Sequence, residues 1–340
     1  MRSDNEISIS RDMFTREQLI EKIKRGEYLM IAADETVLRD LPSGNWIGGT
    51  IPYFMTREGG MSDKNRIFVH TLEGISPSRA PRISIYDVDS ISRIAQETPE
   101  HGFTLVILPA LSEIHLSYAK NAPDYPNMYF SPIIGWIAGI HLSDLGKMSP
   151  KVGFGPANGM LADNQVVAMH IPLPEHQLAN INTVNLFVQG DGPAFTFSET
   201  GFHVETCNID GQPGNLAEFV KARNIDTRLP LVANYCGVMI NVSIQQVNAD
   251  SVNLYAPVFA DVTYRFAKPV ENYIESFEKN LPKADSEKIA FSCNCILNYL
   301  YSELEGKKTG NIIGPMTFGE VAYQLMNQTL VYLTLTNTSR

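Results

Sequence analysis

Asn45-Trp46-Ile47-Gly48 recurs, with small changes, as Pro132-Ile133-Ile134-Gly135 and as Asn311-Ile312-Ile313-Gly314. Each of these apolar runs meets a glycine, and each is followed later in the chain by a second strand-like run, at residues 66–69, 165–168 and 329–332. A glycine inside a strand permits a bulge or the close approach of a neighbouring backbone. The recurrence predicts duplicated lobes, although apolar runs with a glycine also occur in β-rich proteins that contain no repeat.

The segments around these runs predict both helices and strands. Thr15 and Gln18 form a capping box at the start of a helix that Gly26 can end. Residues 103–110 are a continuous apolar run, which is typical of a buried central strand. Further helices are expected at residues 87–97, 215–223 and 270–280, and further strands at residues 28–33, 132–139, 289–295 and 330–336.

This mixture of elements predicts an α+β fold with two lobes, each a largely antiparallel or mixed sheet covered by helices. The polar stretch at residues 223–229 precedes Pro230, after which the sequence becomes rich in valine, isoleucine and tyrosine. We therefore expect a tail and first helix at residues 1–26, a first lobe at 27–226 and a second lobe at 227–340.

Composition and charge exclude several classes of protein. The chain has 340 residues, of which 44% are hydrophobic and 19% charged, so it contains enough apolar material for full-sized cores. A formal net charge of -10, without a dense Lys/Arg cluster, argues against nucleic acid and anionic membranes as partners. Residues 1–14 lack the apolar core of a signal peptide, so we expect a cytoplasmic protein with reduced cysteines.

Motifs for catalysis and metal binding are missing or have simpler explanations. The sequence contains neither a Gly-x-Ser-x-Gly elbow nor a His-Glu-x-x-His motif. Cys293 and Cys295 would share one face of a strand, but buried structural cysteines are favoured over a metal site because the sequence offers no second pair of ligands nearby. No cofactor is predicted, while haem stays open because one of the seven histidines would suffice as its ligand.

Aromatic residues and one arginine are candidate ligand contacts. Trp46 and Trp136 are the two tryptophans of the chain, and both flank an Ile-Gly element of the repeats, the first of which contains Gly48. They could line one shared apolar pocket, and plain core packing explains them equally well. Arg265 follows an aromatic-rich stretch and could bind a ligand carboxylate, the alternative being a surface ion pair with Asp261.

The C-terminal end of the chain resembles the C-terminal domain of the FIST family of signal-transduction domains. The resemblance rests on Phe291-Ser292-Cys293, on Gly314, on a Gly-Glu element within residues 317–322 and on a final strand at residues 327–333. Residues 46–50 and 67–72 are weakly similar to the N-terminal half of that family. The Gly-Arg pair that often follows the cysteine in the family is absent here, which puts any arginine-dependent ligand contact in doubt.

The resemblance implies a sensor. FIST domains are regarded as input modules that bind small molecules, with amino acids suggested as ligands, and some bacterial members bind haem and sense nitric oxide. Carried over to this sequence, the ligand contacts would be Cys293 and Glu320. A buried glutamate needs a partner, so Glu320 would face a ligand amine or an internal basic side chain. Because no signalling segment is attached, the sensor would act through a separate partner protein.

Four functions stay open at this point. The first is an intracellular small-molecule sensor that is not an enzyme, and the second is a haem-binding nitric-oxide sensor. The third is an enzyme with Cys293 as nucleophile, which would need a nearby base and a lowered thiol pKa. The fourth is an interaction protein without a ligand, with the Gly/Pro/Asn-rich loop at residues 121–164 as its docking surface. The missing catalytic constellation favours the first.

Overall fold

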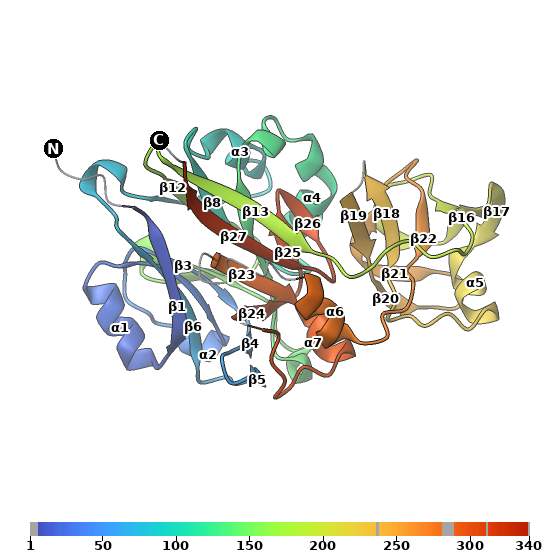
Figure 1. Ribbon diagram of the computed structural model, residues 1–340, viewed down its shortest axis with the longest axis horizontal. Coiled ribbons are helices and arrows are strands. Elements are labelled where there is room, and N and C mark those ends of the chain that lie inside the picture. Colours follow the sequence, from blue (N-terminus) through green and yellow to red (C-terminus); the bar gives the residue numbers. More distant parts are fainter. Residues whose placement is uncertain (1–5, 236–237, 281–288, 311, 339–340) are drawn as a thin grey trace.

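The computed structural model describes residues 6–235, 238–280, 289–310 and 312–338. The chain forms two lobes (Figure 1). The larger lobe contains the first and the last strand of the chain, and the smaller lobe is built from the segment between β13 (Gln177–Val184) and α6 (Tyr273–Asn280). Strands dominate both lobes and helices lie at their periphery, so the fold is α+β, as predicted.

The larger lobe consists of three repeats with one order of elements: strand, helix, strand, helix, strand, hairpin, strand. The first repeat comprises β1 (Ser8–Phe14), α1 (Arg16–Lys24), β2 (Tyr28–Ala33), α2 (Glu35–Leu38), β3 (Trp46–Thr50), β4 (Tyr53–Met55), β5 (Gly60–Ser62) and β6 (Ile67–Glu73). The second comprises β7 (Arg82–Tyr86), α3 (Ile94–Glu97), β8 (Gly102–Pro109), α4 (Glu113–Asn121), β9 (Ile133–Ala138), β10 (Val152–Phe154), β11 (Met160–Ala162) and β12 (Val166–Pro172). The third comprises β13, α6, β23 (Ile289–Cys295), α7 (Ile296–Tyr301), β24 (Gly314–Thr317), β25 (Glu320–Ala322), β26 (Gln324–Met326) and β27 (Leu330–Asn337).

Each repeat forms a six-stranded sheet that is completed by a hairpin from another repeat. The strand orders are β1-β6-β2-β3-β10-β11, β7-β12-β8-β9-β25-β26 and β13-β27-β23-β24-β4-β5. In each sheet the second and third strands of the repeat pair in parallel. The first repeat gives its hairpin to the third sheet, the second repeat to the first sheet, and the third repeat to the second sheet. The three sheets are therefore interlocked, and the predicted duplication is a threefold repeat.

The recurring glycines lie in the third strand of each repeat. A Cβ atom on Gly135 would lie 1.8 Å from the carbonyl oxygen of Val106 on β8, and one on Gly314 would lie 2.1 Å from that of Ser292 on β23. Gly48 on β3 has more room, because the nearest atoms would be 3.4 Å away. In two of the three repeats, the parallel neighbour therefore approaches too closely for any side chain.

The three sheets enclose one apolar core. Phe68 from the first sheet, Trp136 from the second and Phe291 from the third are all buried in it. Burial of such a side chain contributes about 1.5–3 kcal/mol. A second core joins the outer side of the second sheet to the smaller lobe, and a third lies between α1 and the first sheet.

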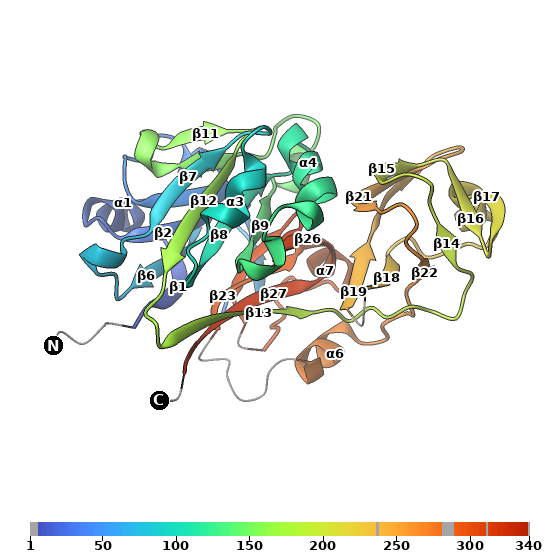
Figure 2. The same ribbon diagram turned by 90° about the horizontal axis from the view of Figure 1, so that it is seen from above.

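The smaller lobe is an insertion into the third repeat, and Figure 2 shows it beside the larger lobe. Its sheets have the orders β17-β16-β14-β22-β18-β19 and β15-β21-β20. Residues 223–229, the expected boundary between lobes, lie inside it, because strands before and after this segment share one sheet. Its elements are β14 (Phe195–Thr196), β15 (Gly201–Val204), β16 (Thr206–Ile209), β17 (Gln212–Asn215), α5 (Leu216–Ala222), β18 (Leu231–Tyr235), β19 (Val238–Val242), β20 (Ile244–Val247), β21 (Val252–Val258) and β22 (Tyr264–Phe266).

Most expected elements are present, and two differ. The helix expected at residues 87–97 is reduced to the 3₁₀ turn η2 (Ile91–Arg93) and the short α3, because Asp87 and Ser90 bind each other's backbone amides and hold a turn. Strand β1 occupies part of the expected polar tail. The remaining 3₁₀ turns are η1 (Pro77–Arg79), η3 (Ala122–Asp124), η4 (Met128–Phe130), η5 (Leu142–Asp144) and η6 (Gly155–Ala157).

Candidate functional site: a basic cleft along strand β1

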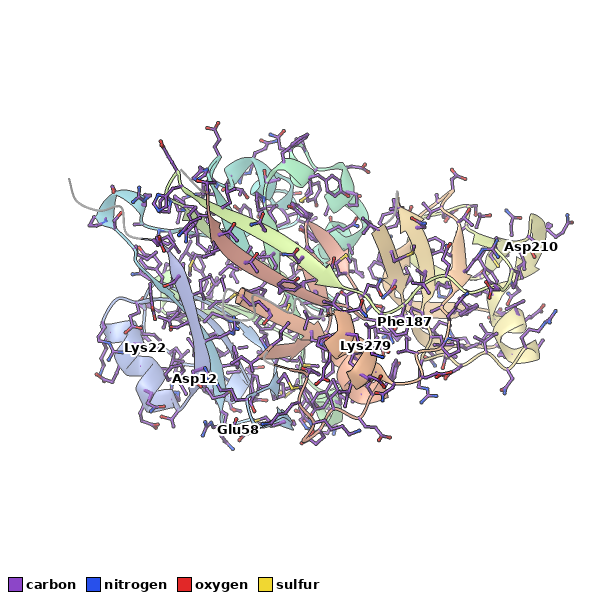
Figure 3. The ribbon with its side chains drawn as sticks, viewed as in Figure 1. Asp12, Lys22, Glu58, Phe187, Asp210 and Lys279 are labelled. Carbon is purple, nitrogen blue, oxygen red and sulfur yellow. The ribbon has the colours of Figure 1, made fainter. Side chains whose placement is uncertain are left out.

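A cleft of about 760 Å³ runs along β1, the edge strand of the first sheet. Residues of the third repeat complete it, and its lining includes Ile9, Arg11, Arg57, Ile289, Lys308 and Ile313. Figure 3 labels Asp12, on β1, and Glu58, which follows Arg57 in the chain. Small-molecule sites typically measure about 300–1,000 Å³. The size of this cleft therefore suits a ligand.

Arg11 faces the interior because side chains alternate along a strand. Ile9, Arg11 and Met13 share one face of β1, and the two apolar residues pack on the central core. The guanidinium of Arg11 is thereby largely withdrawn from solvent and donates a hydrogen bond to the carbonyl oxygen of Ile289. No carboxylate in the described part of the chain lies within ion-pair distance of it.

Two further cations line the same cleft. Arg57 lies in the turn between β4 and β5, and Lys308 lies between α7 and β24. Neither forms an ion pair with a residue that the structure describes. Burial first, and then the positive charge of Arg57, lower the pKa of Arg11 to about 10. Among the residues that the structure describes, three cations and one acidic residue, Asp12, line the cleft, in a protein whose net charge is -10.

His70 lies beside Arg11 in the interior and is not one of the residues that line the cleft. The two residues face each other across β6 and β1, and the imidazole packs on Phe291 with ring centroids 4.8 Å apart. Burial, followed by the charge of Arg11, lowers the pKa of His70 to about 3, so the ring is neutral. Its Nε2 atom is fully buried and has no hydrogen-bond partner within the described ranges.

Trp46, Gly48 and Arg265, three of the residues predicted to bind a ligand, lie apart from this cleft. Trp46 belongs to the core beneath α1, whereas Trp136 belongs to the central core, so the two tryptophans do not form the shared pocket that the sequence suggested. Successive side chains of a strand point to opposite faces of the sheet. Trp46 points to the face that packs against α1, whereas Trp136 points to the face that packs on the central core. Gly48 lies on β3 beside Trp46, and Arg265 lies in the smaller lobe, where it donates to the carbonyl oxygen of Gly192.

The other predicted residues, Cys293 and Glu320, meet Trp136 in the interior. Glu320 on β25 pairs with Trp136 on β9, and the thiol of Cys293 donates to the carbonyl oxygen of Gly135 at 3.3 Å. The cavity that borders Cys293 measures about 10 Å³. Such a volume holds roughly one water molecule. This group is therefore part of a packed core.

Glu320 is fully buried, and its partner is a hydroxyl group. Its Oε2 atom accepts hydrogen bonds from the Thr329 hydroxyl at 2.7 Å and from the Thr329 amide at 3.2 Å. Burial raises the pKa of Glu320 to about 8, so the carboxyl group is protonated at neutral pH. A neutral carboxyl group needs no counter-charge, and Thr329 takes the place that the sequence analysis assigned to a ligand amine or a basic side chain.

The two buried thiols are expected to be unreactive in the folded protein. Burial, and next the negative charge that Glu320 carries once it is ionised above its own raised pKa, raise the pKa of both Cys293 and Cys295. Because the thiolate is the reactive form, treatment of the native protein with iodoacetamide at pH 8 should leave both residues unmodified while the urea-unfolded protein is fully alkylated. Peptide mass spectrometry measures the extent. Fast, selective alkylation of Cys293 in the native state would instead favour the nucleophile hypothesis.

Sequence reasoning missed Arg11, Arg57 and Lys308. A signal for the first existed, because Ile7, Ile9, Arg11 and Met13 alternate with polar residues, the pattern of a half-buried strand. An arginine on the apolar side of such a strand is a candidate for a buried charge. Arg57 and Lys308 carry no local signal, since only the exchange of hairpins between sheets brings them to β1.

The geometry defines an α+β protein of three interlocked repeats, with an inserted lobe and a basic cleft at the edge of its first sheet. The chain belongs to a family of unknown function, DUF6976, whose model matches residues 14–336. No curated protein matches the chain. The matching family is not the FIST family, so the resemblance at the C-terminal end stays a prediction.

Two further observations concern membranes and metals. Among the described helices, none has the length and apolar character needed to cross a membrane. Across the same ranges, no three histidine, cysteine, aspartate or glutamate side chains gather in a way that would hold a metal ion.

Proposed function

We propose that this protein is a non-enzymatic cytoplasmic receptor that binds a small molecule in the cleft along β1 and passes its binding state to a separate protein. The cleft itself carries the proposal. It has a volume of about 760 Å³, and its lining combines the apolar Ile9, Ile289 and Ile313 with charged and polar side chains, which contribute most of its exposed surface. Concave sites of this size are typical of small-molecule binding, and the polar lining favours a polar or charged ligand.

The position of the cleft supports a sensory role. Its walls come from the first and the third repeats, so a bound molecule would contact both. A ligand that binds only the folded state stabilises it, by about 2.7 kcal/mol at a hundred times its dissociation constant. Binding would therefore stabilise the contact between the first and the third repeats. A partner protein that binds at this contact would distinguish the ligand-bound from the ligand-free protein.

A thermal-shift screen of the full chain tests this function. The library contains amino acids, dicarboxylates, phosphates, nucleotides, neutral sugars and haem. We expect at least one compound to raise the melting temperature, and we expect Ser10→Trp, which places an indole in the cleft, to abolish the shift. Ser198→Trp, at an exposed position of the smaller lobe, is the matched control and should keep it.

Other outcomes of the screen would favour the alternatives. A Soret band after addition of haem would support the haem-sensor function. A shift that survives in Ser10→Trp would place the ligand elsewhere and contradict the proposed site. No shift with any compound would contradict the receptor function and favour an interaction protein without a ligand.

A further inference from the structure

The second repeat contains a counterpart of the Arg11 site. Arg82 on β7 lies opposite His170 on β12, as Arg11 on β1 lies opposite His70 on β6. The strands β7 and β12 have the same places in the second sheet as β1 and β6 have in the first. Two repeats of one chain therefore present the same arginine–histidine pair, and their surroundings can be compared directly.

In the second repeat the protein itself balances the charge. Arg82 Nη1 and the Tyr86 hydroxyl both donate to Glu97 Oε2 at 2.9 Å. The same hydroxyl lies 2.8 Å from His170 Nε2, and His170 Nδ1 lies 2.8 Å from the Thr104 hydroxyl. The guanidinium thus has a carboxylate, and both ring nitrogens have partners.

In the first repeat the same pair has no such carboxylate in the described part of the chain. Arg11 donates to the carbonyl oxygen of Ile289, and His70 Nε2 is buried without a described hydrogen-bond partner. Arg57 and Lys308 add further positive charge to the cleft. Withdrawing a charge from water without a counter-charge is costly, and like charges at close range add to that cost. The cleft therefore favours a negatively charged occupant.

We propose that the ligand of this cleft carries an anionic group, a carboxylate or a phosphate, which Arg11 and Arg57 bind together, with the exposed Lys308 at the rim. The inference rests on the proposed function and names the chemical class of ligand for the same site. Guanidinium groups suit this role because their N–H donors match paired carboxylate or phosphate oxygens. Ile9 and Ile313 provide apolar contacts for the rest of the molecule.

Carboxylate and phosphate ligands share this chemistry, and calorimetric titration distinguishes them. Citrate and inorganic pyrophosphate are titrated separately into the full chain, with glucose as the neutral probe. We expect one of the two anions to bind, and Arg11→Gln and Arg57→Gln each to weaken its binding by about tenfold or more, since a hydrogen bond to a charged group is lost. Arg57 is exposed, so its variant keeps the test valid even where Arg11→Gln does not fold.

Arg82→Gln is the matched control. Its guanidinium is already paired with Glu97, so we expect anion affinity to stay within about twofold of wild type. Anion binding that is equally strong in Arg11→Gln and Arg57→Gln would show an adventitious surface site and overturn the inference. Neutral molecules that bind in the cleft while neither anion does would overturn the inference and leave the proposed function standing. No binding of any kind would overturn both.

A second control addresses charge balance within the chain. Asp285 and Glu287 lie outside the described residues and are the acidic residues that precede Ile289 most closely in the sequence. The double variant D285N/E287Q should bind the anion with unchanged affinity. A rise of tenfold or more would mean that the protein neutralises the cleft with its own carboxylates, and it would overturn the inference.

Discussion

Gly135→Ala is expected to destabilise the protein by about 3 kcal/mol, the upper part of the usual range for overpacking. The added Cβ would lie 1.8 Å from the carbonyl oxygen of Val106, far inside van der Waals contact, so β8 and β9 would have to separate. These strands form the parallel pair at the centre of the second sheet. Urea unfolding followed by tryptophan fluorescence measures the loss.

The other two recurring glycines provide the control for this prediction. Gly314→Ala should cost a similar amount, because its Cβ would lie 2.1 Å from the carbonyl oxygen of Ser292. Gly48→Ala should change the stability by less than about 1 kcal/mol, since ordinary contacts of 3.4 Å surround that position. Equal effects at Gly48 and Gly135 would contradict the close approach of the strands as the reason for the recurring glycine.

Glu320→Gln is expected to remove a pH dependence of stability. Burial raises the pKa of Glu320 from the ordinary value of 4.5 to about 8. Between these values the folded state binds more protons than the unfolded state, so the free energy of unfolding of the wild type falls as the pH rises. As the pH rises through this range, the free energy of unfolding of the wild type should fall relative to that of Glu320→Gln by about 1.4 kcal/mol per pH unit.

Urea unfolding at pH 5, 6, 7 and 8 tests this expectation. The thiols of Cys293 and Cys295 interact electrostatically with Glu320. Their pKa values are raised, so both thiols stay neutral over this pH range and do not contribute to the pH dependence. Glu275→Gln serves as the control, because Lys279 lowers the pKa of the exposed Glu275 and its difference from wild type should stay constant. A constant difference for Glu320→Gln as well would mean that Glu320 is ionised in the folded protein at pH 5.

The fold could be predicted from the sequence wherever local signals determine an element. The capping box of Thr15 and Gln18 and the apolar run that became β8 are of this kind. The threefold repeat was recognised only as a duplication, because the smaller lobe separates β13 from the rest of the third repeat. The exchange of hairpins between sheets has no local signal at all, since it depends on contacts between repeats.

The candidate site could not be predicted in the same way. Arg11 is partly withdrawn from solvent because β1 packs against the start of β23, and its hydrogen-bond partner Ile289 lies 278 positions later in the chain. The residues singled out from the sequence, such as Trp136 and Cys293, are buried core residues. Large aromatic residues and free cysteines are common in cores, so their residue types alone do not distinguish a pocket from packing.

The binding of an anionic small molecule in the cleft along β1 is tested most directly by locating a bound anion. Crystals of the protein soaked in selenate would reveal the selenium by anomalous scattering. We expect a peak within hydrogen-bonding distance of both Arg11 and Arg57, and no comparable peak at Arg82, which Glu97 already neutralises. Selenate bound at other places, with none between Arg11 and Arg57, would contradict the role proposed for this cleft.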